Sequence, residues 1–129
     1  MTSIWLTPVT ARPWGEILRR YERIEGDSFD PMCELVERIR RSRYAAGLHA
    51  ITSMHTLVLS NTPGFDLNWE VLRIDWDPAI DSFLFEFVEQ PLVATRWRKR
   101  VPRAEGYAAL GRLVRRKGWF VEYGGPRGG

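Results

Sequence analysis

A length of 129 residues, with 44% hydrophobic and 27% charged residues, is typical of one globular domain and excludes an intrinsically disordered chain. No apolar run approaches the roughly 20 residues of a membrane-spanning helix, and residues 1–16 lack a secretory-signal pattern, so we expect a cytoplasmic protein that makes no contact with a membrane. Cys33 is the only cysteine, which excludes an internal disulfide, and the excess of arginine over lysine indicates a high-GC bacterial gene.

The net charge of +3 is unevenly distributed along the sequence. Residues 1–65 hold eight basic and seven acidic side chains, residues 66–89 hold one and seven, and residues 90–117 hold nine and one. Segregation of this kind either attracts an oppositely charged partner or is neutralised between neighbouring strands. The fold decides between these two outcomes.

Two helices are predicted in the first third of the chain. The segment that opens at Pro13 carries an apolar stripe at helical spacing and ends at Gly26. A second helix is predicted over residues 30–42, with Asp30 as its cap and Pro31 in its first turn. The two stripes consist of Trp14, Ile17, Leu18, Tyr21 and Ile24, and of Met32, Leu35, Val36 and Ile39.

The pattern then changes to that of β-strands. Alternating or β-rich segments occupy residues 49–61, 68–77, 82–89 and 92–101, with turn-forming residues between them. Four consecutive strands with short connections predict an antiparallel meander.

A third helix is predicted within residues 102–120, with close packing at Gly106 or Gly111 and an end at Gly118. Trp119, Phe120 and Val121 are expected to fold back onto the core. The predicted fold is therefore a single α+β domain over residues 1–123, with two N-terminal helices, a four-stranded antiparallel meander sheet and a C-terminal helix packed on one face of the sheet. Residues 124–129 are predicted to form a flexible tail.

The sequence RWRKRVPR, residues 96–103, holds five basic side chains around one tryptophan. Strand alternation places Trp97 and Lys99 on one face and Arg96, Arg98 and Arg100 on the other. If Glu89 pairs with Val93, then Phe85 faces Trp97, Glu86 faces Arg96, and Phe83, Phe85 and Phe87 are buried. A two-residue loop would instead mix aromatic and basic side chains on one face, as single-stranded nucleic acid prefers. Burial of three phenylalanines outweighs exposed ion pairs and favours the first register.

No catalytic, metal or nucleotide motif stands out in the sequence. His49 and His55 lack the spacing of metal ligands, with only His55 expected clearly inside a strand, and Cys33 has no histidine at a known distance. Ser53 and His55 are expected on one strand face without a nucleophile elbow, and Asp75 and Asp77 are interpreted as strand and turn residues. We therefore expect no metal and no cofactor.

The first functional hypothesis is a non-enzymatic protein-interaction domain that presents a charged sheet face to another protein or to a second copy of this chain. Small bacterial adaptors and toxin-neutralising immunity proteins have this general character. Its candidate contact residues are Arg96, Arg98, Arg100, Arg103, Trp69, Asp75 and Glu86.

The alternative hypothesis is a nucleic-acid-binding protein that uses the basic strand 96–103 and the basic C-terminal helix. Its candidate residues are Arg96, Arg98, Arg100, Arg103, Arg112, Arg115, Arg116 and Lys117. An enzyme with an unrecognised site across the sheet is a lesser alternative.

Overall fold

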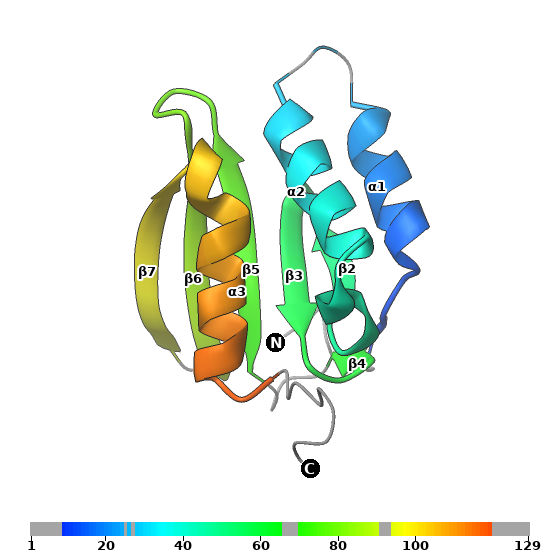
Figure 1. Cartoon of the computed structure of the whole chain (residues 1–129), viewed down its shortest axis with the longest axis vertical. Helices are drawn as coiled ribbons and strands as arrows, with labels where there is room; N and C mark the ends of the chain where they lie inside the picture. The colour runs from blue at the N-terminus through cyan, green and yellow to red at the C-terminus, as the bar shows by residue number, and fades with distance from the viewer. Residues whose placement is uncertain (1–8, 25, 27, 66–69, 91–93, 120–129) are drawn as a thin grey trace, which may run out of the picture.

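Three helices lie on the same side of a five-stranded antiparallel sheet in the computed structural model, which describes residues 9–24, 26, 28–65, 70–90 and 94–119 (Figure 1). The sheet strands follow one another in the order β2 (His49–Ser53), β3 (Thr56–Ser60), β5 (Val71–Asp77), β6 (Ser82–Gln90) and β7 (Ala94–Pro102). Two short strands, β1 (Val9–Thr10) and β4 (Gly64–Phe65), pair with each other. The predicted α+β class and the antiparallel meander are confirmed.

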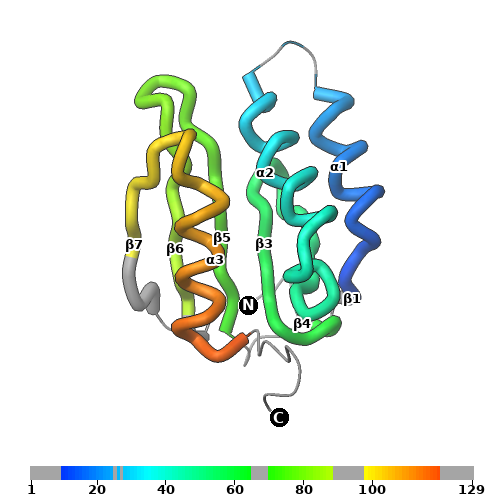
Figure 2. The backbone as a smooth tube through the Cα atoms, viewed as in Figure 1, coloured from blue at the N-terminus to red at the C-terminus, as the bar shows by residue number. Residues whose placement is uncertain are grey.

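The helices cover different halves of the sheet. In Figure 1, α1 (Trp14–Glu22) and α2 (Asp30–Arg40) lie over β2 and β3, whereas α3 (Gly106–Arg116) lies over β5 and β6. Single turns of 3-10 helix, η1 (Arg43–Ala46) and η2 (Arg103–Glu105), follow α2 and precede α3. Figure 2 shows that α2 and α3 run in the same direction, so their C-terminal ends lie at the same end of the molecule.

The predicted strand over residues 49–61 is wrong, because it is a hairpin of β2 and β3. Ser53 pairs with Thr56 across a turn at Met54 and His55, and Met54 adopts a left-handed backbone with φ of 58°. The turn contains no Gly, Asn or Asp, the residues that usually indicate such a bend. The extra strand raises the count from four to five, and it places Ile51 opposite Val58 instead of on the face of Leu57 and Leu59.

The helix boundaries differ in detail from the prediction. Phe29, and not Asp30, is the residue before α2, so Asp30 lies in the first turn, where its charge still suits the helix dipole. At the other end of the chain, Gly118 has a φ of 74° and follows Lys117, the C-cap of α3, so the helix ends at a left-handed glycine as predicted. Close packing is found at both predicted glycines: a Cβ at Gly106 would lie 2.5 Å from the Phe83 ring, and one at Gly111 would lie 2.8 Å from the hydroxyl of Tyr44.

The main core fills the space between the sheet and the three helices. Phe83, Phe85 and Phe87 are each 2% exposed, which confirms their predicted burial. They pack with apolar side chains of α1, α2 and α3, including Ile17, Met32, Leu35, Ile39, Leu110 and Val114. A smaller buried cluster of Ile51, Val58, Val71 and Val88 lies on the opposite side of the sheet.

The register of β6 and β7 differs from the prediction by two residues. Phe87 pairs with Trp97, Glu86 with Arg98 and Phe85 with Lys99, because β6 extends to Gln90 and β7 starts at Ala94. The three-residue connection therefore comes one residue later than predicted. A shift of two residues leaves every side chain on its predicted face, so the assignment of faces holds while the predicted pairs of Phe85 with Trp97 and Glu86 with Arg96 are wrong.

Several predictions fall on parts of the chain outside the described residues. These are the position of Trp69, the return of Phe120 and Val121 to the core, and the flexible tail at residues 124–129. The backbone of Arg96 and Trp97 belongs to β7, but their side chains are outside the described part of the structure.

Candidate functional site

A row of alternating charges crosses three strands on the sheet face opposite the helices. Arg73 of β5 pairs in register with Glu86 of β6, and Glu86 pairs with Arg98 of β7. Arg73 Nε lies 4.0 Å from Glu86 Oε1, and Arg98 Nε lies 3.6 Å from Glu86 Oε2. The carboxylate therefore lies between two guanidinium groups, and the charge order across the sheet is positive, negative, positive.

The neighbouring row has a different composition. Asp75 of β5 pairs in register with Leu84 of β6, and Leu84 pairs with Arg100 of β7. Asp75 accepts a hydrogen bond from the hydroxyl of Thr56, whereas Arg100 is exposed and Leu84 is 38% exposed. Together the two rows form what we call the charged face, which consists of Arg73, Asp75, Leu84, Glu86, Arg98 and Arg100.

A depression lies over the β6 and β7 part of the charged face. This depression has a volume of about 410 Å³. Another depression, of about 470 Å³, lies elsewhere on the molecule. Its lining consists of Asp75, Leu84, Phe85, Glu86, Arg98, Lys99 and Arg100. The depression is therefore lined by charged groups of both signs and by the side chain of Leu84. A side chain of a partner can enter this space.

The predicted contact residues divide into three groups. Asp75, Glu86, Arg98 and Arg100 come together on the charged face. Arg103 lies away from them in η2, where its guanidinium donates to Glu34 of α2 from Nε at 3.2 Å and from Nη2 at 2.6 Å. Because β7 ends at Pro102, Arg103 is no longer part of the strand and does not share the face of Arg98 and Arg100. Trp69 and the side chain of Arg96 lie outside the described residues.

The candidate contact residues named from the sequence do not include Arg73 and Leu84 of this face. The two-residue period of a strand could have identified them, because Arg73 lies two residues before Asp75 and Leu84 lies two residues before Glu86. Residues that share a strand face with a candidate site residue belong to the same surface.

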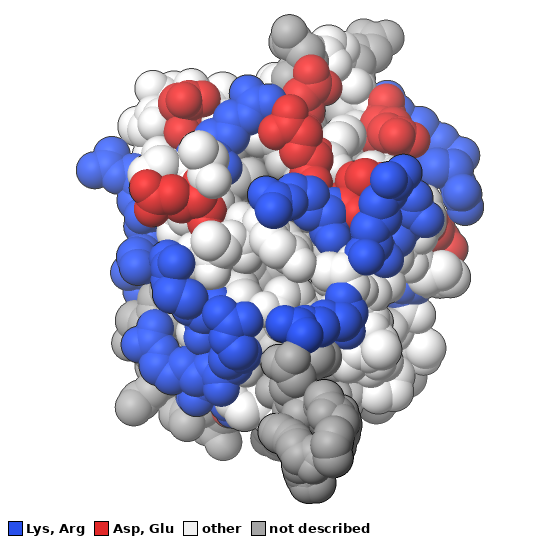
Figure 3. Space-filling model, in the orientation of Figure 1, with Lys and Arg blue, Asp and Glu red and all other residues white. Residues whose placement is uncertain are grey.

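The basic residues of α3 form a second positively charged surface, on the helix side of the molecule. Figure 3 shows Lys and Arg atoms in both halves of this face, whereas the acidic atoms lie mostly in the upper half, so basic atoms without acidic neighbours are concentrated in the lower half. The shared end of α2 and α3 explains this concentration, because both helices carry basic residues in their last turns. The predicted members of this surface on α3 and directly after it are Arg112, Arg115, Arg116 and Lys117, all exposed.

Two members of this surface also hold the fold together. Arg115 donates a hydrogen bond from Nη1 to the hydroxyl of Tyr44, and the Nζ of Lys117 lies 4.3 Å from the ring centroid of Phe87. The sheet separates this surface from Arg98 and Arg100. The two basic groups therefore meet only around the edge strand β7, where Lys99 is exposed.

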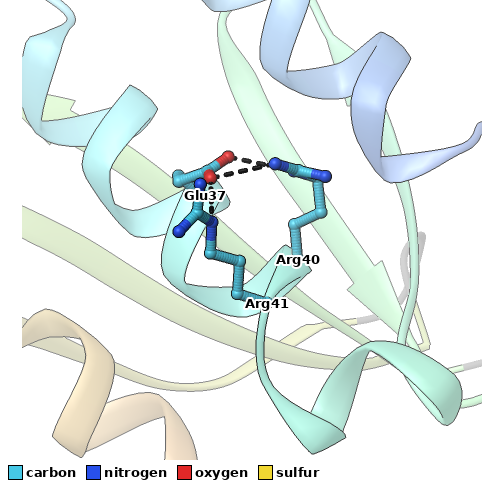
Figure 4. Close-up of polar contacts among 3 residues, drawn as sticks. All are labelled: Glu37, Arg40 and Arg41. Atoms are coloured by element: carbon cyan, nitrogen blue, oxygen red, sulfur yellow. Dashed lines mark hydrogen bonds and ion pairs between the residues drawn. The ribbon is translucent and has the colours of Figure 1, made fainter.

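The arginines at the end of α2 are neutralised in part by their own helix. Figure 4 shows Glu37 between Arg40 and Arg41. Arg40 donates to Glu37 from Nε and Nη2, each at 2.9 Å, and Arg41 also donates to this carboxylate. These hydrogen bonds, that from Arg40 first, lower the pKa of Glu37.

The depression of about 470 Å³ lies between α2 and the start of α3. The Glu34–Arg103 ion pair bridges it, and Arg38 lies over the Tyr107 ring at 4.2 Å from the centroid. Its four charged lining residues are Glu34, Asp81, Arg38 and Arg103. Because their charges balance, this depression carries no preference for one sign of ligand.

The two histidines do not lie in the elements that the sequence suggested. His49 lies inside β2 and His55 in the following turn, the reverse of the expectation, and the His55 ring contacts that of Phe29 at 5.0 Å between centroids. Burial, followed by the nearby carboxylates of Glu22 and Asp30, raises the pKa of Cys33 and disfavours its thiolate. Within the described part of the chain, no group of three or more His, Cys, Asp or Glu side chains is placed to hold a metal ion.

None of the helices in the described ranges has the length and apolar character needed to cross a bilayer. Comparison of the chain with protein-family models, with curated proteins and with solved structures gave no match.

Proposed function

We propose that this is a cytoplasmic, non-enzymatic protein-interaction domain that binds its partner through the charged face. The observation that carries the proposal is the Arg73–Glu86–Arg98 row, in which an acid lies between two bases on an exposed sheet surface. The excess of arginine over lysine, a feature of high-GC bacterial genes, makes a small bacterial adaptor or an immunity-type partner the form of this function that we favour.

The mixed signs of the charged face fit a protein partner better than a polyanion. A phosphate backbone presents only negative charge and gains affinity from each base that it neutralises. Here Glu86 and Asp75 would repel phosphates next to Arg98 and Arg100. A protein surface can present acids and bases in the complementary order, which orients the complex and speeds association.

The proposed contact has an apolar centre as well as charge. Leu84 is 38% exposed between Asp75 and Arg100 and lines the depression of about 410 Å³. Protein interfaces place apolar side chains in such a centre and surround them with polar groups. An apolar or aromatic side chain of the partner is therefore expected to enter the depression over Leu84.

A charge swap tests this proposal without changing net charge. Affinity-tagged protein carrying Glu86→Arg and Arg98→Glu keeps an opposite-charge pair between β6 and β7 but reverses the order that a partner meets. The matched control is the swap Glu34→Arg with Arg103→Glu, an ion pair on the helix side of the molecule. Each tagged protein is expressed in the source cells, and the co-purified proteins are quantified by mass spectrometry.

We expect the wild type and the control swap to retain one partner at a fixed stoichiometric ratio, and the charged-face swap to lose it. If the partner is a second copy of this chain, sedimentation velocity shows a dimer that the charged-face swap dissociates. Absence of any stoichiometric partner for the wild type, or retention of the partner by the charged-face swap, would overturn the proposal.

A second candidate function, nucleic-acid binding, rests on the basic surface at the end of α3. Arg112, Arg115, Arg116 and Lys117 are exposed there, and Lys99 extends the surface towards the β7 edge. The lower half of the face in Figure 3 shows no comparable acidic group among the described residues. A single-sign surface of this kind suits a phosphate backbone.

Titration of labelled single-stranded and duplex DNA and RNA at low and moderate salt tests this second function. Binding that falls steeply with salt, and that is lost on Arg112→Glu with Arg116→Glu, would support it. The control variant is Arg98→Glu with Arg100→Glu, which makes the same change in net charge on the opposite side of the sheet. No binding at low salt would end this candidate.

A further inference from the structure

A basic cleft lies between α1 and the edge strand β2, on the opposite edge of the sheet from β7. It has a volume of about 550 Å³, within the range of ligand-binding clefts. Its lining consists of Arg12, Glu16, Ile17, Arg20, Arg23, Ile24, Ile51, Thr52 and His55. The cleft therefore joins one face of a helix to the exposed edge of a sheet.

The backbone of β2 is already paired at one point along this edge. The amide of Arg12 donates to the carbonyl of Ala50 at 2.9 Å, in an isolated antiparallel bridge. The carbonyl of Ala50 therefore points away from β3 and towards the edge. Because backbone direction repeats every two residues in a strand, the amide and carbonyl of Thr52 point the same way.

The chain leaves this edge just before the cleft. Because the bridge is antiparallel, the residues that precede Arg12, Ala11 and Thr10, lie towards Thr52. Ala11 donates to the carbonyl of Pro63 at 2.8 Å and Thr10 pairs with Gly64 of β4, and neither pairs with β2 among the described residues. Thr52 itself lines the cleft. An added extended segment could thus pair with Thr52, next to the bridge at Ala50, which is the geometry of recognition by strand addition.

The charge of the cleft selects an acidic ligand. Three arginines line it against the single carboxylate of Glu16, which lies 3.8 Å from Arg12. Arg20 and Arg23 are exposed, and neither forms an ion pair with any residue in the described part of the chain. Two guanidinium groups are therefore available to carboxylates of a ligand.

The floor of the cleft is apolar. Ile17, which is 2% exposed, and the half-buried Ile24 line it from the helix side, and Ile51, which is 5% exposed, lines it from the opposite side of the sheet. An extended peptide directs alternate side chains to opposite sides. Acidic side chains can thus reach the arginines of α1 on one side of the sheet edge while apolar side chains contact Ile51 on the other.

We propose that this cleft binds an extended acidic peptide segment of a partner protein, which adds to the edge of β2 at Thr52 and pairs its carboxylates with Arg20 and Arg23. The segment alternates acidic with apolar residues. This site is separate from the charged face, so either proposal can fail without the other.

The test uses a fluorescein-labelled hexapeptide of alternating valine and glutamate, with fluorescence polarisation as the readout of binding to the full chain. We expect saturable binding that weakens about tenfold or more on Arg20→Glu with Arg23→Glu, since like charges would then meet at the site. The matched control, Arg19→Glu with Arg41→Glu, makes the same change in net charge at exposed positions that do not line the cleft and is expected to leave this binding within about twofold.

The hydrogen-exchange rate of the Thr52 amide is a second measurement, because charge attraction alone would leave this rate unchanged. Strand addition protects this amide in the presence of the peptide, while free glutamate at the same carboxylate concentration leaves it unprotected. The proposal is overturned if the two α1 charge reversals do not weaken binding, if Thr52 stays unprotected at saturation, or if free glutamate competes with the peptide at equal carboxylate concentration.

Discussion

Glu86 and Arg98 face each other across β6 and β7, with 3.6 Å between Glu86 Oε2 and Arg98 Nε, and the same carboxylate lies 4.0 Å from Arg73. The side chain of Arg98 is 76% exposed and that of Arg73 is 44% exposed. Exposed pairs of this kind contribute little to folding. The row therefore contributes little to stability, as the proposed role in partner recognition requires.

Replacement of Glu86 by glutamine tests this distinction. We expect Glu86→Gln to lower the free energy of unfolding by about 1 kcal/mol or less, with the difference shrinking at high salt. The same variant is expected to weaken partner binding strongly, because two arginines would remain without the acid between them. Urea unfolding at two salt concentrations measures the first effect, and Glu105→Gln on the other side of the molecule is the control.

A second prediction concerns the basic stretch as protection of a sheet edge. In the described part of the chain β7 has β6 as a neighbour on one side only, and Arg98, Lys99 and Arg100 are exposed along it. Charged side chains on an edge strand oppose pairing between copies of the same strand. The stretch therefore has a structural role whichever partner binds it.

Replacement of these three residues by threonine should expose that role. Threonine suits a strand but carries no charge, so we expect the triple variant to self-associate at concentrations where the wild type does not. Sedimentation velocity across a concentration series is the measurement. The control, Arg112→Thr with Arg116→Glu, lowers the net charge by the same three units at exposed positions of α3 and is expected to leave the sedimentation unchanged.

The sequence predicted the elements that depend on local periodicity. The prediction failed where the backbone conformation of a single residue determines the structure. The apolar stripes identified all three long helices of the described chain, and alternation assigned the phenylalanines of β6 to the core. The hairpin at Met54 was missed because its residues do not favour a turn. The charged face was found only in part, since its pairs depend on where the loop between β6 and β7 begins.

A third prediction concerns the missed turn. Met54 has a φ of 58° and is 80% exposed, so its side chain gains little from burial while its backbone occupies a region unfavourable to L-residues. We expect Met54→Gly to stabilise the protein by about 1 kcal/mol. Met54→Ala keeps the Cβ and its strain, so it should have almost no effect. Thermal and urea unfolding of the three proteins compare them, and an equal effect of alanine and glycine would contradict the backbone explanation.

A fourth prediction concerns the contact between α3 and the sheet. A Cβ at Gly106 would lie 2.5 Å from Cε2 of Phe83, and the Phe83 side chain is buried at 2% exposure. We expect Gly106→Ala to destabilise the fold by about 1–3 kcal/mol through overpacking. Gly15→Ala on α1 is the opposite case, because its nearest atom would be Arg19 Nη1 at 3.7 Å. That variant should stabilise α1 by roughly 0.5–1 kcal/mol. Urea unfolding of both variants measures whether the free energy of unfolding falls for Gly106→Ala and rises for Gly15→Ala.

The last prediction concerns Glu37, whose pKa the hydrogen bonds from Arg40 and Arg41 lower below its ordinary value. A carboxylate with a lowered pKa in the folded state adds stability above its unfolded pKa and loses that contribution as the pH falls through the folded pKa. We expect Arg40→Gln to move the Glu37 titration midpoint upwards, since it removes the larger of the two hydrogen-bond contributions. Carboxylate ¹³C NMR during acid titration measures this midpoint. Arg19→Gln on α1 removes an equal charge without touching Glu37 and should leave it unchanged, whereas equal shifts in both variants would assign the effect to net charge.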